Sequence, residues 1–147
     1  IVAQQQPETV DELSKKPVAV NAGRPIALQK YADQYVIDGL LSSNPVSLLI
    51  DTGASVTAIS RQYFNRLSNR YKVNYLGRFS IGTAAGSIKA SMYQFRELRI
   101  GHVKVENLPV VVLPMREIEN ADGLLGMNFL REFDFKIDQR QSVMFIK

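Results

Sequence analysis

The stretch Val46-Ser47-Leu48-Leu49-Ile50-Asp51-Thr52-Gly53-Ala54-Ser55-Val56-Thr57-Ala58-Ile59-Ser60 carries the strongest structural signal in this sequence. An apolar run ends at a carboxylate, a hydroxyl and a glycine, and a second apolar run follows. Short apolar runs bounded by turn residues are typical of buried strands. Asp51 is therefore expected at the interior end of a strand, where desolvation disfavours a charged group. Gly53 permits a tight turn and leaves no side chain over the carboxylate. A plain strand and turn without chemistry is the alternative.

The composition is that of a single globular domain. The chain has 147 residues, is 46% hydrophobic and carries a net charge of +4, so it is long enough to bury a core. It contains no cysteine, which excludes disulfides, thiolate metal sites and cysteine nucleophiles. Its basic residues are scattered rather than gathered into a stripe. We therefore expect a solvated face and no nucleic-acid partner.

Residues 1–30 differ from the rest of the chain. They are polar, are punctuated by Pro17, Gly23 and Pro25, and contain only brief apolar pieces. We expect a linker or N-terminal extension that contributes at most one edge strand. The first residues, Ile1-Val2-Ala3, are compatible with the end of a secretory signal. Contact with a membrane is expected only through an anchor upstream of the sequence.

Residues 31–147 are expected to form the folded domain, and it is all-β. Alternating or continuous apolar runs between turn residues predict the strands. A helix over 61–67 is expected behind Ser60 as N-cap, and a short helical turn is expected at Phe129 and Leu130. The predicted strands are 35–41, 46–50, 56–59, 74–81, 87–95, 98–105 (a hairpin turning at 101–102), 108–114, 134–137 and 142–146.

Other catalytic classes find little support in the sequence. His102, the single histidine, falls at a hairpin turn and is expected to face solvent. No G-x-S-x-G elbow accompanies it, which disfavours a Ser-His-Asp triad. A lone histidine with scattered acids offers no metal-ligand spacing. No metal and no cofactor are therefore expected.

Three motifs together resemble the retropepsin-type aspartic proteases, the single-lobed kind also found in bacteria. They are residues 49–55, the glycine-bounded hairpin Ile81 to Ile88 with the tip Gly82-Thr83-Ala84-Ala85-Gly86, and Gly123-Leu124-Leu125-Gly126. The resemblance implies a closed or partly open β-barrel with one short helix near the C-terminus. It also implies that the first motif carries the catalytic aspartate, the second is a flap over the substrate, and the third crosses beneath the first.

The implied activity is that of an aspartic endopeptidase, a hydrolase. Two nearby carboxyls can share one proton and act as base and acid toward a peptide bond. The sequence holds one D-T-G, so the second Asp51 is expected from a second copy of the chain, in a two-fold homodimer. Asp122 is the rival carboxylate within the chain, and its place before Gly123 is typical of a turn.

The resemblance also assigns roles to individual residues. Asp51, Thr52 and Gly53 are the expected catalytic loop, with Thr52 bracing the two loops across the axis and Gly53 contacting the substrate. The expected substrate-binding residues are Thr83, Ala84, Ala85, Gly86, Val56, Ile81, Ile88 and Val112. The expected support of the site consists of Ala54, Ser55, Leu124, Leu125 and Gly126.

The expected partners are a polypeptide substrate and a second copy of the chain. Terminal strands interleave in retropepsin dimers, and residues 142–147 are the candidates for this here. Bacterial relatives are often exported or anchored at the inner membrane, so an extracytoplasmic, periplasmic location is expected. The alternative function is a binding or oligomerisation module that keeps the fold with little catalysis.

Overall fold

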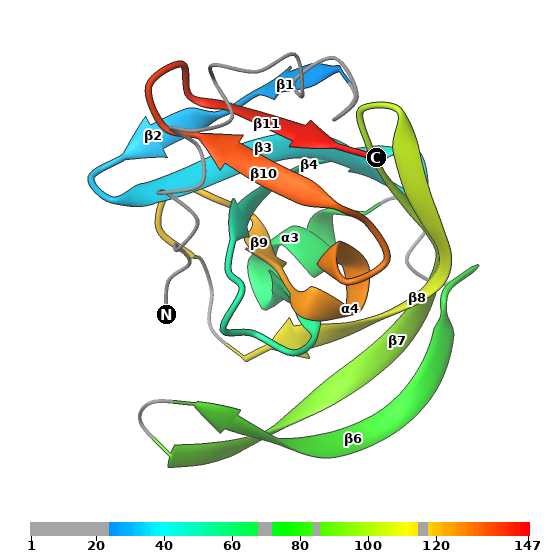
Figure 1. Cartoon of the computed structure of the whole chain (residues 1–147). Coiled ribbons are helices and arrows are strands. Elements are labelled where there is room, and N and C mark those ends of the chain that lie inside the picture. Colours follow the sequence, from blue (N-terminus) through cyan, green and yellow to red (C-terminus); the bar gives the residue numbers. More distant parts are fainter. Residues whose placement is uncertain (1–23, 68–71, 84–85, 115–117) are drawn as a thin grey trace.

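The computed structural model describes residues 24–67, 72–83, 86–114 and 118–147 (Figure 1). Within these residues, β-strands dominate and the two helices are short, which confirms the expected all-β class. The helices are α3 (Arg61–Arg66) and α4 (Met127–Leu130). The strands are β1 (Pro25–Ala27), β2 (Gln29–Tyr31), β3 (Gln34–Leu41), β4 (Asn44–Ile50), β5 (Thr57–Ser60), β6 (Asn74–Thr83), β7 (Gly86–Ile100), β8 (Val103–Leu113), β9 (Gly123–Leu125), β10 (Phe135–Asp138) and β11 (Val143–Ile146).

Eight of the strands form one large sheet in the order β2-β3-β4-β9-β5-β8-β7-β6. β3 also pairs with β7, through Leu40 with Arg99 and Leu41 with Leu98. This second pairing turns the sheet back on itself, and the curled sheet is visible in Figure 1. The main hydrophobic core lies inside the curl and includes Phe95, Leu98 and Phe129, each at most 1% exposed.

The arrangement around β9 positions the site. β4 and β5 are separated by only a few residues in the sequence, yet β9 lies between them, parallel to β4 and antiparallel to β5. Beyond β5 the sheet continues with β8, which is parallel to β5. Residues 51–56 must therefore pass around the end of β9 to connect β4 with β5.

β8 separates the main core from a second, smaller cluster. Successive side chains of a strand point to opposite faces. Accordingly, Val110 and Val112 join the main core, whereas Val111 and Leu113 join the second cluster with Ala58 and Ala90. Both faces of β8 are buried in its last four residues, 110–113, which explains the continuous apolar sequence there.

β7 and β8 are longer than the sequence predicted. Residues 87–95 and 98–100 are one continuous strand, and β8 runs from Val103 to Leu113 opposite it. The predicted strands 87–95 and 98–105 leave out the polar pair Arg96-Glu97. The ladder continues through it, because a strand with one solvated side tolerates polar residues there. The hairpin turn at Gly101 and His102 is confirmed.

A small three-stranded sheet, in the order β1-β11-β10, contains the last strand of the chain. β1 pairs with β11, while β2 pairs with β3 in the large sheet. Residues 24–30 thus contribute to two short strands, where the sequence predicted at most one. Each strand is three residues long, too short for hydrophobic alternation to reveal it. Residues 1–23 lie outside the described part of the chain.

Both helices occur where the sequence predicted them. The Ser60 side chain caps α3 by accepting a hydrogen bond from the Tyr63 N–H at 3.1 Å, as expected of an N-cap serine. α4 is the predicted short helix near the C-terminus, and it buries Phe129 and Leu130.

Candidate active site

Asp51 lies directly after β4 and is 5% exposed. Its main-chain N–H donates to the Leu125 carbonyl at 3.1 Å, which fastens this end of β4 to β9. Its Oδ1 accepts the Gly53 N–H at 3.0 Å, and its own carbonyl accepts the Ala54 N–H at 3.1 Å. These bonds fix both the turn and the orientation of the carboxyl group. The D-T-G segment therefore presents a buried, rigidly held carboxylate.

The start of α4 holds the rest of the same loop. The Met127 N–H donates to the Ala54 carbonyl at 2.8 Å, and the Asn128 N–H donates to the Ser55 carbonyl at 3.1 Å. The first N–H groups of a helix have no partner within the helix. Here the loop carbonyls supply those partners, so helix and loop support each other.

Asn128 and Thr57 form a polar contact that the sequence did not predict. Asn128 Oδ1 accepts the Thr57 N–H at 2.9 Å and the Thr57 hydroxyl at 2.8 Å. Asn128 Nδ2 donates to the Pro109 carbonyl at 2.9 Å, and Thr57 Oγ1 accepts the Gly126 N–H at 3.1 Å. The sequence hinted at this contact only through Thr57, a hydroxyl residue inside an apolar strand. That hint is weak, because threonine is β-branched and is common in strands for that reason alone.

Two glycines of the Gly123-Leu124-Leu125-Gly126 motif are required by close packing. A Cβ on Gly126 would lie 2.6 Å from the Val56 carbonyl carbon and 2.8 Å from the Thr57 nitrogen. A Cβ on Gly123 would overlap the Ala58 carbonyl oxygen. Real Cβ atoms do not approach backbone atoms so closely, so β9 can lie between β4 and β5 only with glycine at both positions.

A cavity of about 760 Å³ opens beside Asp51. It is bounded by the loop that carries Asp51, by β6 and by the second hydrophobic cluster. Asp51 is the one ionisable side chain in the described lining, and the remaining lining residues are apolar, small or hydroxylic. The lining consists of Asp51, Gly53, Ala54, Ser55, Val56, Ala58, Phe79, Ser80, Ile81, Gly82, Met92, Val111, Leu113 and Leu124.

The lining includes some of the predicted substrate-binding residues and not others. Val56 and Ile81 belong to it. Ile88 packs against the second cluster without lining the cavity, and Val112 lies in the main core on the opposite face of β8. The neighbours Val111 and Leu113 line the cavity instead. In a strand buried on both faces, composition does not tell which alternate residues face which side.

The glycine-bounded hairpin is the β6–β7 connection. Ile81 pairs with Ile88, Gly82 with Ser87, and Thr83 with Gly86. Gly86 has a φ of +116°, a backbone conformation that favours glycine. Ala84 and Ala85 lie outside the described residues.

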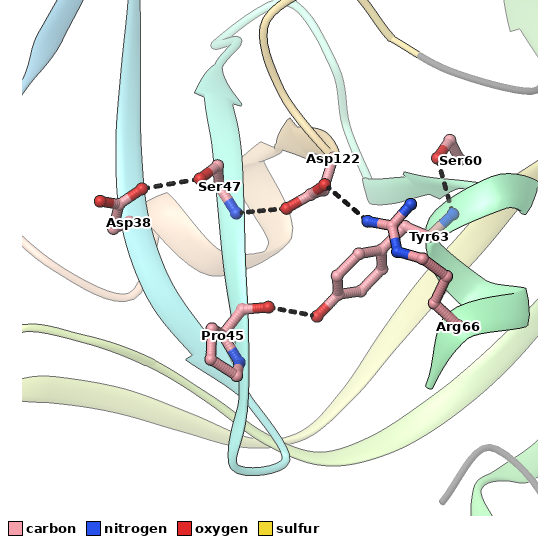
Figure 2. Close-up of polar contacts among 7 residues, drawn as sticks. All are labelled: Asp38, Pro45, Ser47, Ser60, Tyr63, Arg66 and Asp122. Atoms are coloured by element: carbon pink, nitrogen blue, oxygen red, sulfur yellow. Dashed lines mark hydrogen bonds and ion pairs between the residues drawn. The ribbon is translucent and has the colours of Figure 1, made fainter. Parts of the chain in front are cut away.

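Asp122 holds strands together and is not a second carboxylate of the site. Its Oδ2 accepts the Ser47 N–H at 2.8 Å, and its main-chain N–H donates to the Ser47 carbonyl at 2.7 Å. Figure 2 shows Asp122 between Ser47 and Arg66, whose Nη2 lies 3.4 Å from Asp122 Oδ1. At about 3.3 Å per strand residue, Ser47 is on the order of 13 Å from Asp51. The interpretation of Asp122 as a structural residue agrees with this geometry.

Tyr63 belongs to the same polar cluster. Its hydroxyl donates to the Pro45 carbonyl at 2.7 Å (Figure 2). Burial, and next the carboxylate of Asp122, raise the pKa of Tyr63, against a smaller lowering by Arg66. The hydroxyl therefore stays protonated and keeps joining α3 to the start of β4.

The remaining sequence candidates lie apart from the cavity. His102 is exposed, and its Nε2 lies 2.8 Å from the Ile146 carbonyl oxygen. Within the described residues, no group of three or more potential ligands is placed to hold a metal ion. None of the helices in the described part of the chain is long and apolar enough to span a membrane.

The chain is similar to known aspartic proteases in sequence and in fold. The family model described as "gag-polyprotein putative aspartyl protease" matches residues 37–132. A retropepsin-like aspartic protease from Rickettsia conorii superposes with a TM-score of 0.61 at 24% identity, over 84% of this chain and 89% of that one. The EIAV protease, solved with the inhibitor HBY-793, superposes with a TM-score of 0.54 at 17% identity, over 71% of this chain and 91% of the other. These two structures share the fold. Among curated proteins, none matches the sequence significantly.

Proposed function

Because the chain belongs to the gag-polyprotein aspartyl protease family, we propose that it is an aspartic endopeptidase acting as a homodimer. The observation that carries the proposal is the buried Asp51, held by Gly53 and Leu125 at the wall of an apolar cavity. A purely structural module has no need of a carboxylate at that place. One chain supplies one such group, so the pair needs a second copy.

The chemistry follows from two carboxyls that share one proton. Like charges in contact cannot both ionise, so one Asp51 is a carboxylate and the partner's Asp51 is an acid. The carboxylate takes a proton from a water molecule, whose oxygen bonds to the peptide carbonyl carbon. The acid protonates the carbonyl oxygen. When the C–N bond breaks, the leaving nitrogen receives a proton from the carboxyl that took it from water. The other Asp51, now a carboxylate, takes one hydroxyl proton back from the gem-diol, so a carboxylic acid and an amine leave and the dyad again holds one proton.

The cavity indicates the kind of side chain that the substrate carries. Its walls include Phe79, Ile81, Met92, Val111 and Leu124, with no basic residue among the described lining. Burying a charged side chain there would cost free energy without an ionic partner. We propose that the substrate is an extended peptide with apolar residues beside the cleaved bond, covered by the hairpin at residues 83–86.

The test compares wild type with Asp51→Asn on an unbiased peptide mixture from about pH 3 to 7. Asp33→Asn is the matched control, because Asp33 is an exposed turn residue. We expect cleavage by the wild type and the control and none by Asp51→Asn. Specific activity should also fall on dilution, because the site needs two chains.

Two outcomes would contradict the proposal. Equal cleavage by wild type and Asp51→Asn would show that another group performs the reaction. The second outcome is a wild type that is dimeric by sedimentation but cleaves no peptide. This would favour a binding or oligomerisation module that kept the loop carrying Asp51.

A further inference from the structure

The acidic residues of this chain are unevenly distributed. Residues 52–96 contain seven basic residues and no Asp or Glu, whereas the rest of the chain contains 11 basic and 14 acidic residues. The segment 52–96 therefore carries a net charge of +7, and the remainder carries −3. In the fold this segment forms β5, α3, β6 and the first part of β7. A positive field over one part of the surface attracts an anionic partner.

Two basic side chains lie on the face of the β6–β7 hairpin that is opposite the cavity. Successive residues of a strand point to opposite faces, and Phe79 and Met92 line the cavity. Their neighbours Arg78 and Ser91 pair in the register, and Arg78 Nη1 lies 3.5 Å from Ser91 Oγ. Lys89 is two residues before Ser91, so it is on the same face. Its carbonyl accepts a hydrogen bond from Arg78 Nη2 at 3.4 Å, and both basic residues are exposed.

Neither cation is neutralised by an acidic side chain of the described residues. The ion pairs in that part of the chain lie elsewhere, and none of them includes Arg78 or Lys89. Residues in this diagonal relation on adjacent strands are about 7–8 Å apart. An extended chain advances about 6.6 Å over two residues. Two carboxylates at alternate positions of an extended peptide therefore match the spacing of the two cations.

A column of aromatic rings continues the same face beyond Arg78. The ring centroids of Phe64 and Tyr93 are 4.8 Å apart, and those of Tyr93 and Tyr75 are 5.3 Å apart. Tyr75 forms the outer end of the column and is 57% exposed, and the adjacent Leu76 is 41% exposed. Exposed aromatic and aliphatic surface of this kind favours contact with an apolar side chain of a partner.

We propose that this face is an exosite, which binds an acidic segment of the polypeptide substrate away from the cleaved bond. This cationic face consists of Tyr75, Arg78, Lys89 and Tyr93. Tyr93, Ser91 and Lys89 occupy every second position of β7. The matching segment is an extended chain with an apolar residue at one position and acidic residues two and four positions further on. The inference rests on the proposed function, which supplies the polypeptide and the cavity.

One polypeptide can reach both the cavity and the cationic face, because the two share β6. β6 is the last strand of the large sheet, with β7 beside it, and its other edge is open in the described part of the chain (Figure 1). The layers on the two faces of a sheet lie about 10 Å apart, a distance that an extended chain covers in roughly three or four residues. A substrate that leaves the cavity beside Phe79 therefore reaches Arg78 within that length. This continuity, together with the exposed Leu76, favours a polypeptide over a nucleic acid as the occupant.

The test uses a peptide that the wild type cleaves, with an extension about four residues from the cleaved bond. The acidic extension is Leu-Ala-Glu-Ala-Glu and the matched neutral one is Leu-Ala-Gln-Ala-Gln, each placed at either end and in either direction. At about 50 mM NaCl, the best acidic peptide should have a KM roughly threefold to tenfold below that of its neutral match. The value of kcat should be the same for both, because exposed ion pairs away from the reacting bond act on binding alone. The difference in KM should disappear near about 500 mM NaCl, where the charges are screened.

Variants then locate the effect on the surface. Arg78→Gln combined with Lys89→Gln should abolish the preference for the acidic peptide. The matched control, Arg99→Gln combined with Lys104→Gln, removes the same two charges from the far end of β7 and β8, where Glu97 pairs with both. The control should keep the preference. A preference that survives the first double variant, or that the control also loses, would overturn the inference.

Binding to Asp51→Asn separates this inference from the proposed function. A fluorescent Leu-Ala-Glu-Ala-Glu peptide should bind this variant as it binds the wild type, as measured by anisotropy. Such binding by a wild type that cleaves no peptide would support the cationic face and contradict the protease. Cleavage of the acidic and neutral peptides with equal KM would support the protease and overturn the exosite, and so would failure of the fluorescent peptide to bind. Binding of a dT oligonucleotide or of anionic vesicles through Arg78 and Lys89, without a preference for the acidic peptide, would assign the face to a nucleic acid or a membrane and overturn the inference.

Discussion

The side chain of Asn128 joins three parts of the molecule that are far apart in sequence. It binds both polar groups of Thr57 on β5, and it binds the Pro109 carbonyl on β8. Its main-chain N–H holds the Ser55 carbonyl. Thr57 is 1% exposed, so water cannot replace these bonds easily. Asn128 is thus a positioning residue for the loop that carries Asp51.

Asn128→Ala should lower the free energy of unfolding by about 2 to 4 kcal/mol, because it leaves buried polar groups of Thr57 and Pro109 without partners. Peptide cleavage should fall as well, since the catalytic loop loses support. Urea unfolding measures the first effect and a peptide assay the second. Gln139→Ala, at an exposed turn, is the control and should stay within about 0.5 kcal/mol of wild type. A loss no larger than the control's would show that Asn128 is not needed there.

At the scale of elements, the site depends on β9 lying between β4 and β5. β9 is only three residues long, yet it pairs with both neighbours and accepts the Asp51 N–H at Leu125. The motif glycines permit this close approach. Asp122 fastens the start of the segment to Ser47, and its carbonyl accepts the Ser60 N–H at 2.9 Å.

Gly126→Ala should destabilise the protein by about 2 kcal/mol or more, because the new methyl group meets the backbone of Val56 and Thr57. Gly82→Ala is a matched control for stability, since a Cβ there meets no atom within 4 Å. Thermal or urea unfolding should therefore separate the two variants clearly. Equal stability of the two variants would mean that β9 can shift away from β5 at little cost.

At the scale of the whole molecule, charge acts against the proposed dimer. Each chain carries a net charge of +4, so two copies repel each other as they approach. Salt screens such repulsion, while the backbone hydrogen bonds and apolar contacts of the interface are affected far less.

Dimerisation should therefore strengthen with salt. Between about 50 and 300 mM NaCl we expect the dimer dissociation constant to fall roughly threefold or more, as measured by sedimentation equilibrium. A dimer that weakens as salt rises would instead point to an interface held together by opposite charges.

Several features of this protein were determined by short pieces of its sequence. The strand leading to Asp51, the turn at Gly53, the Ser60 cap of α3 and the glycines around Leu124 and Leu125 were all predicted. Strand alternation, helix capping and glycine turns act among residues a few positions apart. A local pattern is therefore sufficient to identify them.

Other features were decided only by the tertiary structure. The contact of Asn128 with Thr57, the partners of Asp122, and the side of β8 that faces the cavity each depend on which distant strand lies next to which. The same is true of β1 and β2, which are too short to show a period, and of β11, whose two edges are filled within the chain. Strand order is set by the pairing of segments far apart in the sequence. It therefore cannot be predicted from a local sequence pattern.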